Sequence, residues 1–125
     1  MTAQEVRYPR HGEIWWTRFP TDPPDKGRRP VIVVSRDERN LHPRANTVLV
    51  IPLSTSIHKP ARTHLLLRTG ETGLREDCVA KAEDICVVRR ADMDSPVLGQ
   101  RAVTHTQICR LGSLVKIAIG CVELQ

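Results

Sequence analysis

Three short clusters in this sequence carry side chains able to bind anions or move protons. In chain order they are Arg28-Arg29, Ser54-Thr55-Ser56 and Lys81-Ala82-Glu83. A guanidinium group can make two charge-assisted hydrogen bonds to phosphate oxygens, and a base beside an acid can share proton transfer. Each cluster adjoins an apolar run, so we expect β-strands to position all of them.

The two arginines are expected to be held at the mouth of a rigid strand. They stand in the stretch GRRPVIVVS, between the flexible Gly27 and Pro30. Proline cannot donate a hydrogen bond to a strand ladder, so it belongs at the first residue of a strand or on an edge. Residues 31–34 are β-branched and apolar, which predicts a buried strand. The pattern therefore fixes two positive charges at the entrance to the core.

Short apolar or alternating runs predict a small antiparallel β-barrel or sandwich. In the first strand, Trp15 and Trp16 should point to opposite faces. The proline-rich segment 20–26 and the polar segment 36–46 predict loops, and Gly70 and Gly73 mark a turn. The expected strands are residues 11–19, 30–35, 47–54, 63–68 and 78–89, the last a bent strand or a strand pair.

The C-terminal part predicts an amphipathic helix over residues 104–121. Thr104 followed by Gln107 fits a capping box. Apolar residues then recur at steps of three and four, which places them on one stripe; they are Ile108, Leu111, Val115, Ala118 and Val122. Leu114, Ile117 and Ile119 widen the apolar surface, and either the core or a subunit interface could take the surplus.

Length and composition predict a single globular domain over residues 1–125. The chain is 40% hydrophobic and 26% charged, and its net charge of +5 is compatible with a polyanionic partner. It shows no apolar signal sequence and no run long enough to cross a bilayer, so we expect a cytoplasmic protein. The four cysteines form no C-x-x-C pair. We therefore expect buried, reduced thiols and no zinc site.

The ordered motifs resemble the MazF/PemK/Kid toxins of toxin–antitoxin modules. They are GEIWW, GRRPVIVVS, VLVIPLSTS, RTHLLL, TGL and CVAKAEDI. The resemblance implies an SH3-like β-barrel with a C-terminal helix, and a homodimer. It also implies an endoribonuclease that cuts single-stranded RNA without metal or other cofactor, and a cognate acidic antitoxin like MazE or PemI.

Metal-free RNA cleavage uses the ribose 2′-OH as nucleophile on the adjacent phosphate. It leaves a 2′,3′-cyclic phosphate or a 3′-phosphate, together with a 5′-OH. The charge that develops on the phosphate must be stabilised, best by a group already fixed in place. Arg29 immediately precedes the proline, as the catalytic arginine of the family does. Arg28 stands where the family varies and is expected to be a helper or a solvated charge.

The hydroxyl cluster supplies the second expected catalytic group. Ser54 occupies the position where the family usually has a catalytic threonine, and Thr55 is the reserve. In an isolated Ser-Thr-Ser run we would expect a strand-end hydroxyl that caps its own backbone. The resemblance favours catalysis. It also places Thr55 and Ser56 with Arg28 and His64 on the RNA-binding surface, although His64 could be structural.

Lys81 and Glu83 form the third expected group. If the strand continues, its period of two places both side chains on one face. The Kid branch has Arg-x-Asp here and uses that pair as acid and base. The alternative for Lys81 and Glu83 is an ordinary ion pair worth under about 1 kcal/mol.

Two departures from the family limit what can be carried over. The first loop is PTDPPDK in place of a G-S-E-Q-like stretch, and Glu83-Asp84 replaces a common Asp-Gln pair. The cleavage sequence, the target RNA class and the antitoxin's identity therefore stay open. The alternatives are a gyrase poison resembling CcdB, disfavoured because no aromatic follows Phe19, and an inactive relative that only binds RNA or antitoxin.

Overall fold

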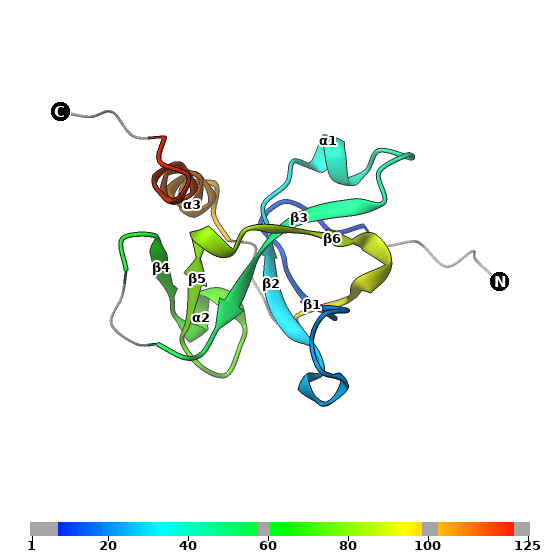
Figure 1. Ribbon diagram of the computed structural model, residues 1–125, viewed down its shortest axis with the longest axis horizontal. Coiled ribbons are helices and arrows are strands. Elements are labelled where there is room, and N and C mark those ends of the chain that lie inside the picture. Colours follow the sequence, from blue (N-terminus) through cyan, green and yellow to red (C-terminus); the bar gives the residue numbers. More distant parts are fainter. Residues whose placement is uncertain (1–7, 58–60, 99–102, 122–125) are drawn as a thin grey trace.

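The computed structural model describes residues 8–57, 61–98 and 103–121. A bent antiparallel sheet of seven strands is joined to one long C-terminal helix (Figure 1). The strands are β1 (Ile14–Thr17), β2 (Arg29–Val33), β3 (Thr47–Ser54), β4 (His64–Leu67), β5 (Cys78–Lys81), β6 (Cys86–Arg89) and β7 (Met93–Pro96). The helices are α1 (Asp37–Asn40), α2 (Thr69–Thr72) and α3 (His105–Ala118), with 3₁₀ turns η1 (Pro24–Lys26), η2 (Ala82–Asp84) and η3 (Arg90–Asp92).

Strand β3 is the centre of the sheet. It pairs with β2 along one edge, while β6 and β5 share the other edge, at its first and second halves. The strand order is β4-β5-β3-β2-β1-β7, and β6 lies off this path beside β3. The antiparallel, barrel-like architecture is confirmed, but among the described strands no ladder closes the sheet on itself.

Each face of the sheet has its own apolar core, which is why the strands are almost continuously hydrophobic. One core lies under α3 and includes Ile14, Ile32 and Ile51. The other lies on the opposite face and includes Trp15, Val33 and Val50. As predicted, the two tryptophans separate: Trp15 belongs to the second core and Trp16 packs against the first.

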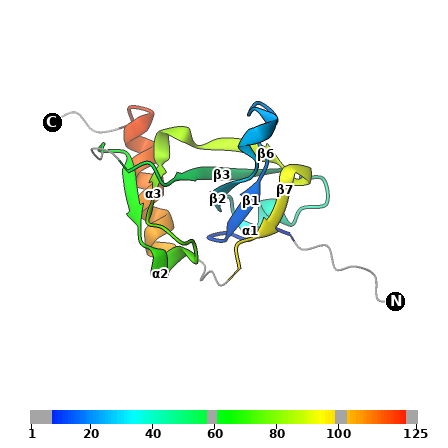
Figure 2. The ribbon, with the colours of Figure 1, turned by 90° about the horizontal axis from the view of Figure 1, so that it is seen from below.

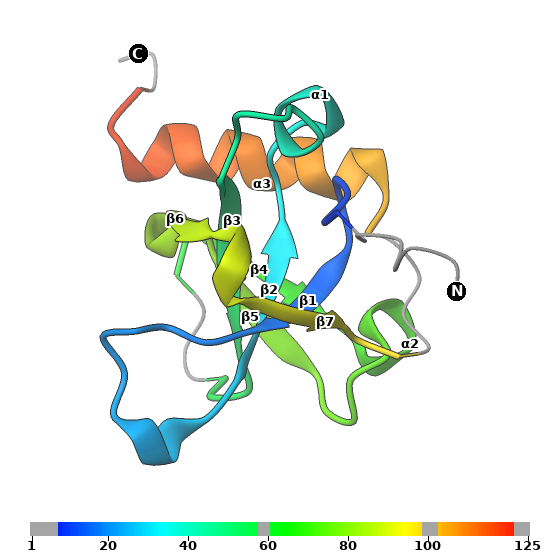
Figure 3. The same ribbon diagram turned by 90° about the vertical axis from the view of Figure 1, so that its right-hand side faces the viewer.

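Helix α3 crosses the sheet and covers the first core (Figure 3). The predicted capping box is present: the Gln107 amide donates to Thr104 Oγ1 at 3.2 Å, and the Thr104 amide donates to Gln107 Oε1 at 3.1 Å. Ile108, Leu111 and Leu114 are buried. Ala118, which the stripe placed in the core, is exposed, and Val122 lies outside the described residues.

Several expected boundaries were wrong. Strand β2 begins at Arg29 instead of Pro30, because Arg29 already pairs with Thr17 of β1. Helix α1 forms inside the expected loop and is anchored by Asn40, which is fully buried and bonds back to Ser35. Strand β7 was missed, since its four residues include an aspartate and a proline and show no apolar alternation.

The cysteines are only partly as expected. All four are free, but only Cys78 is buried, while Cys109 and Cys121 are exposed. Burial, with help from Asp77 and Glu71, raises the pKa of Cys78 to about 11. Within the described ranges, no helix is long and apolar enough to span a membrane.

Candidate active site at the ends of β2 and β3

Arg29 and Ser54 lie on the same face of neighbouring strands. Val31 of β2 is paired with Pro52 of β3. Arg29 lies two residues before Val31 and Ser54 two residues after Pro52, so in an antiparallel ladder both share the face of that pair. This is the face of the second core, turned away from α3. The sheet therefore brings together the two residues expected to act on the phosphate.

The Arg29 guanidinium lies between an aromatic ring and a carboxylate of the β1–β2 loop. Its Cζ lies 5.0 Å from the centre of the Phe19 ring. Its Nη1 lies 3.6 Å from Asp22 Oδ2, longer than a hydrogen bond. That buried Asp22 oxygen has no hydrogen-bond partner within the described residues. The contact is thus an ion pair with incomplete hydrogen bonding, and Arg29 stays 32% exposed.

The pKa of the Cys86 thiol, in β6, responds to burial, to the charge of Asp84 and to the charge of Arg29. Burial raises the pKa of the Cys86 thiol, and the negative charge of Asp84 raises it further. The positive charge of Arg29 acts in the opposite direction. Arg29 therefore lies in a partly buried region where its charge reaches neighbouring groups.

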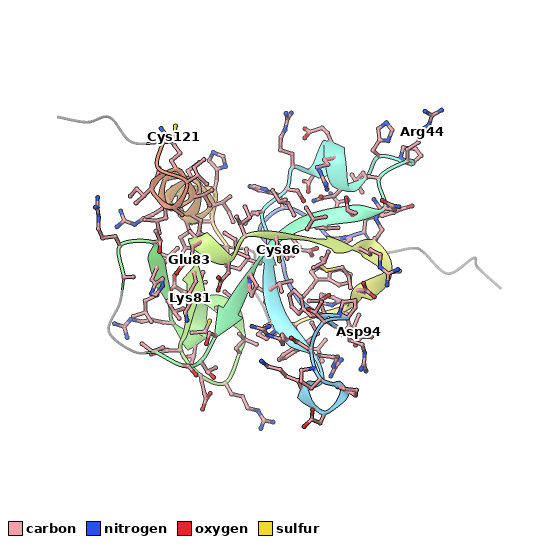
Figure 4. The ribbon with its side chains drawn as sticks, viewed as in Figure 1. Arg44, Lys81, Glu83, Cys86, Asp94 and Cys121 are labelled. Carbon is pink, nitrogen blue, oxygen red and sulfur yellow. The ribbon has the colours of Figure 1, made fainter. Side chains whose placement is uncertain are left out.

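Arg28 points to the other side of the strand and is paired there with an aspartate. It donates to Asp94 Oδ2 at 2.6 Å, and its Cζ lies 5.6 Å from the centre of the Trp16 ring. Figure 4 shows Asp94 away from Glu83 and Lys81. Trp16 packs against the core under α3, whereas Phe19, over which Arg29 lies, packs against the second core. The two adjacent arginines are therefore on opposite faces of the sheet.

The three hydroxyl residues at the end of β3 differ in their surroundings. Ser54 Oγ accepts a hydrogen bond from the Ser56 amide at 3.1 Å, so the backbone cap that a Ser-Thr-Ser run favours is present. This bond uses a lone pair of Ser54 and leaves its proton available for donation. Thr55 is exposed and lines a cavity with Trp16 on the Arg28 side of the sheet. Ser56 is exposed.

The expected pairing of Lys81 with Glu83 on one strand face is wrong. Strand β5 ends at Lys81, and the chain then enters the 3₁₀ turn η2. The period of two stops there, so Glu83 does not follow Lys81 along the strand. In the described structure no hydrogen bond or ion pair joins Lys81 to Glu83.

Glu83 is held by His64 and Thr63 instead. Thr63 Oγ1 donates to Glu83 Oε1 at 2.7 Å, and His64 Nε2 lies 3.1 Å from Glu83 Oε2. His64 Nδ1 accepts from the Ala61 amide, so in the neutral ring Nε2 carries the proton and donates to Glu83. Burial tends to raise the Glu83 pKa, but the hydrogen bonds from Thr63, its own backbone and His64 outweigh it and lower the pKa.

Sequence reasoning missed the groups that contact the expected catalytic residues. Asp22 and Phe19 reach Arg29 from the β1–β2 loop, which lies away from α3 and extends beyond the strands (Figure 2). The only sign of the Asp22 contact in the sequence was the presence of two aspartates in PTDPPDK. Nothing in the sequence indicated that Thr63 would bond to Glu83, because that contact depends on the turn η2. Within the described residues, no three His, Cys, Asp or Glu side chains gather as a metal site.

Comparison of the sequence with known families matches one over most of the chain. The family described as "PemK-like, MazF-like toxin of type II toxin-antitoxin system" matches residues 10–118. A relative named Endoribonuclease MazF9, from Mycobacterium tuberculosis (strain ATCC 25618 / H37Rv), is 29% identical over 115 residues. The match covers 86% of this chain and 93% of that protein.

Solved structures share the fold at low sequence identity. An endoribonuclease from a mycobacterial species, in complex with its cognate antitoxin, is 16% identical with a TM-score of 0.71. That match covers 93% of this chain and 99% of the other. A MazE–MazF structure from Deinococcus radiodurans is also 16% identical, with a TM-score of 0.70, and covers 91% and 97%.

Proposed function

Since the chain belongs to the PemK-like, MazF-like toxins of type II toxin–antitoxin systems, we propose that it is an endoribonuclease toxin that cuts single-stranded RNA without a metal ion. The observation that supports this best is the placement of Arg29 and Ser54 on one face of β2 and β3. The named relative is an endoribonuclease, and inhibition of growth would follow from cleavage of messenger RNA.

The reaction breaks one P–O bond and forms another. The ribose 2′ oxygen attacks the adjacent phosphorus and loses its proton. The bond to the 5′ oxygen breaks, and that oxygen takes up a proton as it leaves. The products are a 2′,3′-cyclic phosphate, which water can open to a 3′-phosphate, and a 5′-OH. Three tasks fall to the protein: charge stabilisation, proton removal and proton donation.

Arg29 is assigned to charge stabilisation. Its planar guanidinium can donate two parallel hydrogen bonds to phosphate oxygens. The β-strand and the Phe19 ring hold it in place, and a preorganised donor needs no rearrangement as charge develops. Asp22 now lies where a phosphate would approach, so RNA must displace this carboxylate or bind beside it.

Ser54 is assigned to hydrogen bonding at the reacting oxygens. Its hydroxyl proton is available to a phosphate oxygen, while the bond from the Ser56 amide orients the oxygen. Glu83 and His64 together are the candidate proton carrier, since the imidazole Nε2 lies against an ionised carboxylate. Lys81 pairs with His64 across the ladder, and its ammonium is assigned to a flanking phosphate.

An acidic antitoxin is the expected protein partner. Carboxylates on a flexible chain can occupy the same charged surface as RNA phosphates, although ordering that chain consumes part of the binding energy. Relatives have been solved in complex with antitoxins. Binding should therefore compete with RNA and weaken as salt rises.

A homodimer is expected through the outer edge of α3 and β6. Val34, Leu49, Ile85 and Val115 line a small apolar cavity there. Val87 pairs with Leu49 and is 56% exposed. Apolar patches of this kind are uncommon on monomers unless they are functional. We expect a second copy of the chain to cover this patch in the dimer.

The proposal is tested by incubating the purified protein with mixed-sequence RNA in EDTA. Cleavage that leaves 5′-OH ends supports a metal-independent ribonuclease. A protein that binds RNA without cutting is the inactive relative. A protein that neither cuts nor binds RNA but blocks gyrase is the CcdB-like alternative.

A further inference from the structure

A cavity of about 560 Å³ opens on the Arg28 side of the sheet and is not used by the proposed chemistry. It is lined by Trp16, Pro30, Thr55, Gly73, Leu74, Arg75, Glu76, Val97 and Leu98. The segment after α2 forms one wall and the end of β7 the other, and Figure 3 shows these elements side by side. Its volume lies in the range of small-molecule sites.

The interior of the cavity is apolar and partly unfilled. Trp16 and Leu74 are only partly buried, although both pack against the core under α3. Leu98 is 89% exposed at the rim. These side chains offer apolar surface that a bound group would cover, beside the Arg28 guanidinium, whose Cζ lies 5.6 Å from the centre of the Trp16 ring.

The rim carries donors and acceptors that have no partner in the described structure. They are the guanidinium of Arg75, the carboxylate of Glu76 and the hydroxyl of Thr55. Other charged groups nearby are paired, as Arg28 is with Asp94. A ligand with an apolar face and polar edges would satisfy both the walls and the rim.

The cavity adjoins the proposed cleavage site through the end of β3. Thr55 follows Ser54 directly, so their Cα atoms lie about 3.8 Å apart. The alternation of side chains sends Ser54 toward Arg29 and Thr55 toward the cavity. A polymer bound at Ser54 that crosses this strand end therefore presents its next groups to the cavity.

We propose that this cavity binds an unpaired nucleobase of the RNA close to the cut and determines which base is accepted there. The inference rests on the proposed ribonuclease function and names the base-reading part of that same site. Proteins read single-stranded RNA by stacking splayed bases on aromatic or guanidinium planes and by hydrogen-bonding their edges. Trp16 supplies the aromatic surface, while Arg75 and Glu76 supply a donor and an acceptor for the base edge.

The observations favour a base over an apolar side chain of a protein partner. A leucine or phenylalanine would fill the walls but leave Arg75 and Glu76 unpaired beside it, and unpaired polar groups at a closed interface are costly. Continuity with Ser54 favours the same ligand at both places.

Binding is tested without any need for cleavage. The full chain, labelled with ¹⁵N, is titrated into the millimolar range with each of the four ribonucleoside 5′-monophosphates, and ribose 5-phosphate is the control. Saturable shifts of the Trp16 indole and of the Gly73 and Leu74 amides, with at least one nucleotide and not with ribose 5-phosphate, support the proposal. Shifts that ribose 5-phosphate reproduces, or no shift at these groups, overturn it. If only an acidic antitoxin segment shifts them, the cavity belongs to a protein partner and the proposal is also wrong.

Base choice is tested by sequencing the ends cut from a random RNA pool. Glu76→Gln and Arg75→Gln are expected to reduce the preference at one position near the cut by about fivefold or more, the effect of losing one base contact. Arg44→Gln is the matched control, because Arg44 precedes β3 at the end opposite Ser54 (Figure 4), and it should leave the preference unchanged. An unchanged preference in both rim variants contradicts the proposal. Nucleotide shifts in a protein that never cuts would refute the ribonuclease function and leave the base site standing.

Discussion

Adjacent arginines at the start of β2 end on opposite faces of the sheet and are held very differently. Arg28 has a 2.6 Å contact with Asp94 and lies over Trp16. Arg29 has a 3.6 Å contact with Asp22, whose oxygen has no hydrogen bond in the described structure. Both positions present the same chemical group, so their environments must account for any difference in function.

The comparison separates an arginine that completes the fold from one that is free to change partners. A satisfied charge has little to gain from a phosphate, since it must first break a good bond. A fixed arginine with an incomplete partner can exchange a carboxylate for a phosphate at small cost. Pairing, more than exposure, distinguishes the two residues, because Arg28 is the more exposed, at 44% against 32%.

The largest expected effect is that of Arg29→Ala on RNA cleavage. We expect the rate to fall by about 10²–10³-fold, the usual cost of removing one preorganised donor to a developing charge. The rate is measured with mixed-sequence RNA in EDTA, and circular dichroism checks that the fold is kept.

Arg28→Ala is the matched control for this change. It removes the same group one residue away, and we expect less than about a fivefold loss of the cleavage rate, because Arg28 is paired with Asp94 on the face opposite Arg29 and Ser54. Equal losses in the two variants would show that the contrast between these arginines has no functional meaning.

Ser54→Ala should have the next largest effect, because Ser54 shares the Arg29 face. Loss of a hydrogen bond to a charged group costs about 1.5–3 kcal/mol, or roughly 10- to 150-fold in rate. Ser54→Thr keeps the hydroxyl and should retain most of the wild-type activity. If Thr55→Val costs more than Ser54→Ala, the reacting hydroxyl lies on the Arg28 face and the assignment is wrong.

Asp22→Asn tests the same contrast between the two arginines by changing Asp22, the ion-pair partner of Arg29. Without its charge, Asp22 competes less with phosphate, and binding of non-cleavable 2′-O-methyl RNA should tighten by up to about fivefold at low salt. Fluorescence anisotropy measures the affinity. Asp25→Asn in the same loop removes an equal charge from an exposed residue and is the control. A loss of cleavage in Asp22→Asn would instead make Asp22 a positioning residue for Arg29.

Glu83, the candidate proton carrier with His64, also stabilises the fold, and this effect on stability should be the smallest of the effects considered. Its pKa is lowered in the folded state from an ordinary 4.5, so its stabilising contribution is present above that value and is lost as the pH falls through the lowered pKa. Glu83→Gln should therefore lower the melting temperature at pH 7, with a difference that shrinks in acid. A difference that is the same at every pH would exclude the ionised carboxylate as the cause.

The parts that local pattern could predict are those built from one continuous segment. The bounds of β3 and the Thr104 capping box follow from neighbouring residues, and so does the placement of Arg29 and Ser54 at strand ends. The contacts of Glu83 could not be predicted, since the turn η2 redirects it to Thr63 and His64. The contact between Asp22 and Arg29 could not be predicted either, because a proline-rich loop has no regular repeat from which the direction of a side chain follows.

The central position of β3 also affects when the molecule becomes active. As the chain leaves the ribosome, β3 can first pair only with β2, and its other edge stays open until β5 and β6 have been synthesised. Ser54 therefore gains its lasting position only after most of the chain is made. Once formed, β3 is held on both edges, so its amides should exchange with solvent only through global unfolding. We therefore expect the site to form late in synthesis, once β5 and β6 can pair with β3.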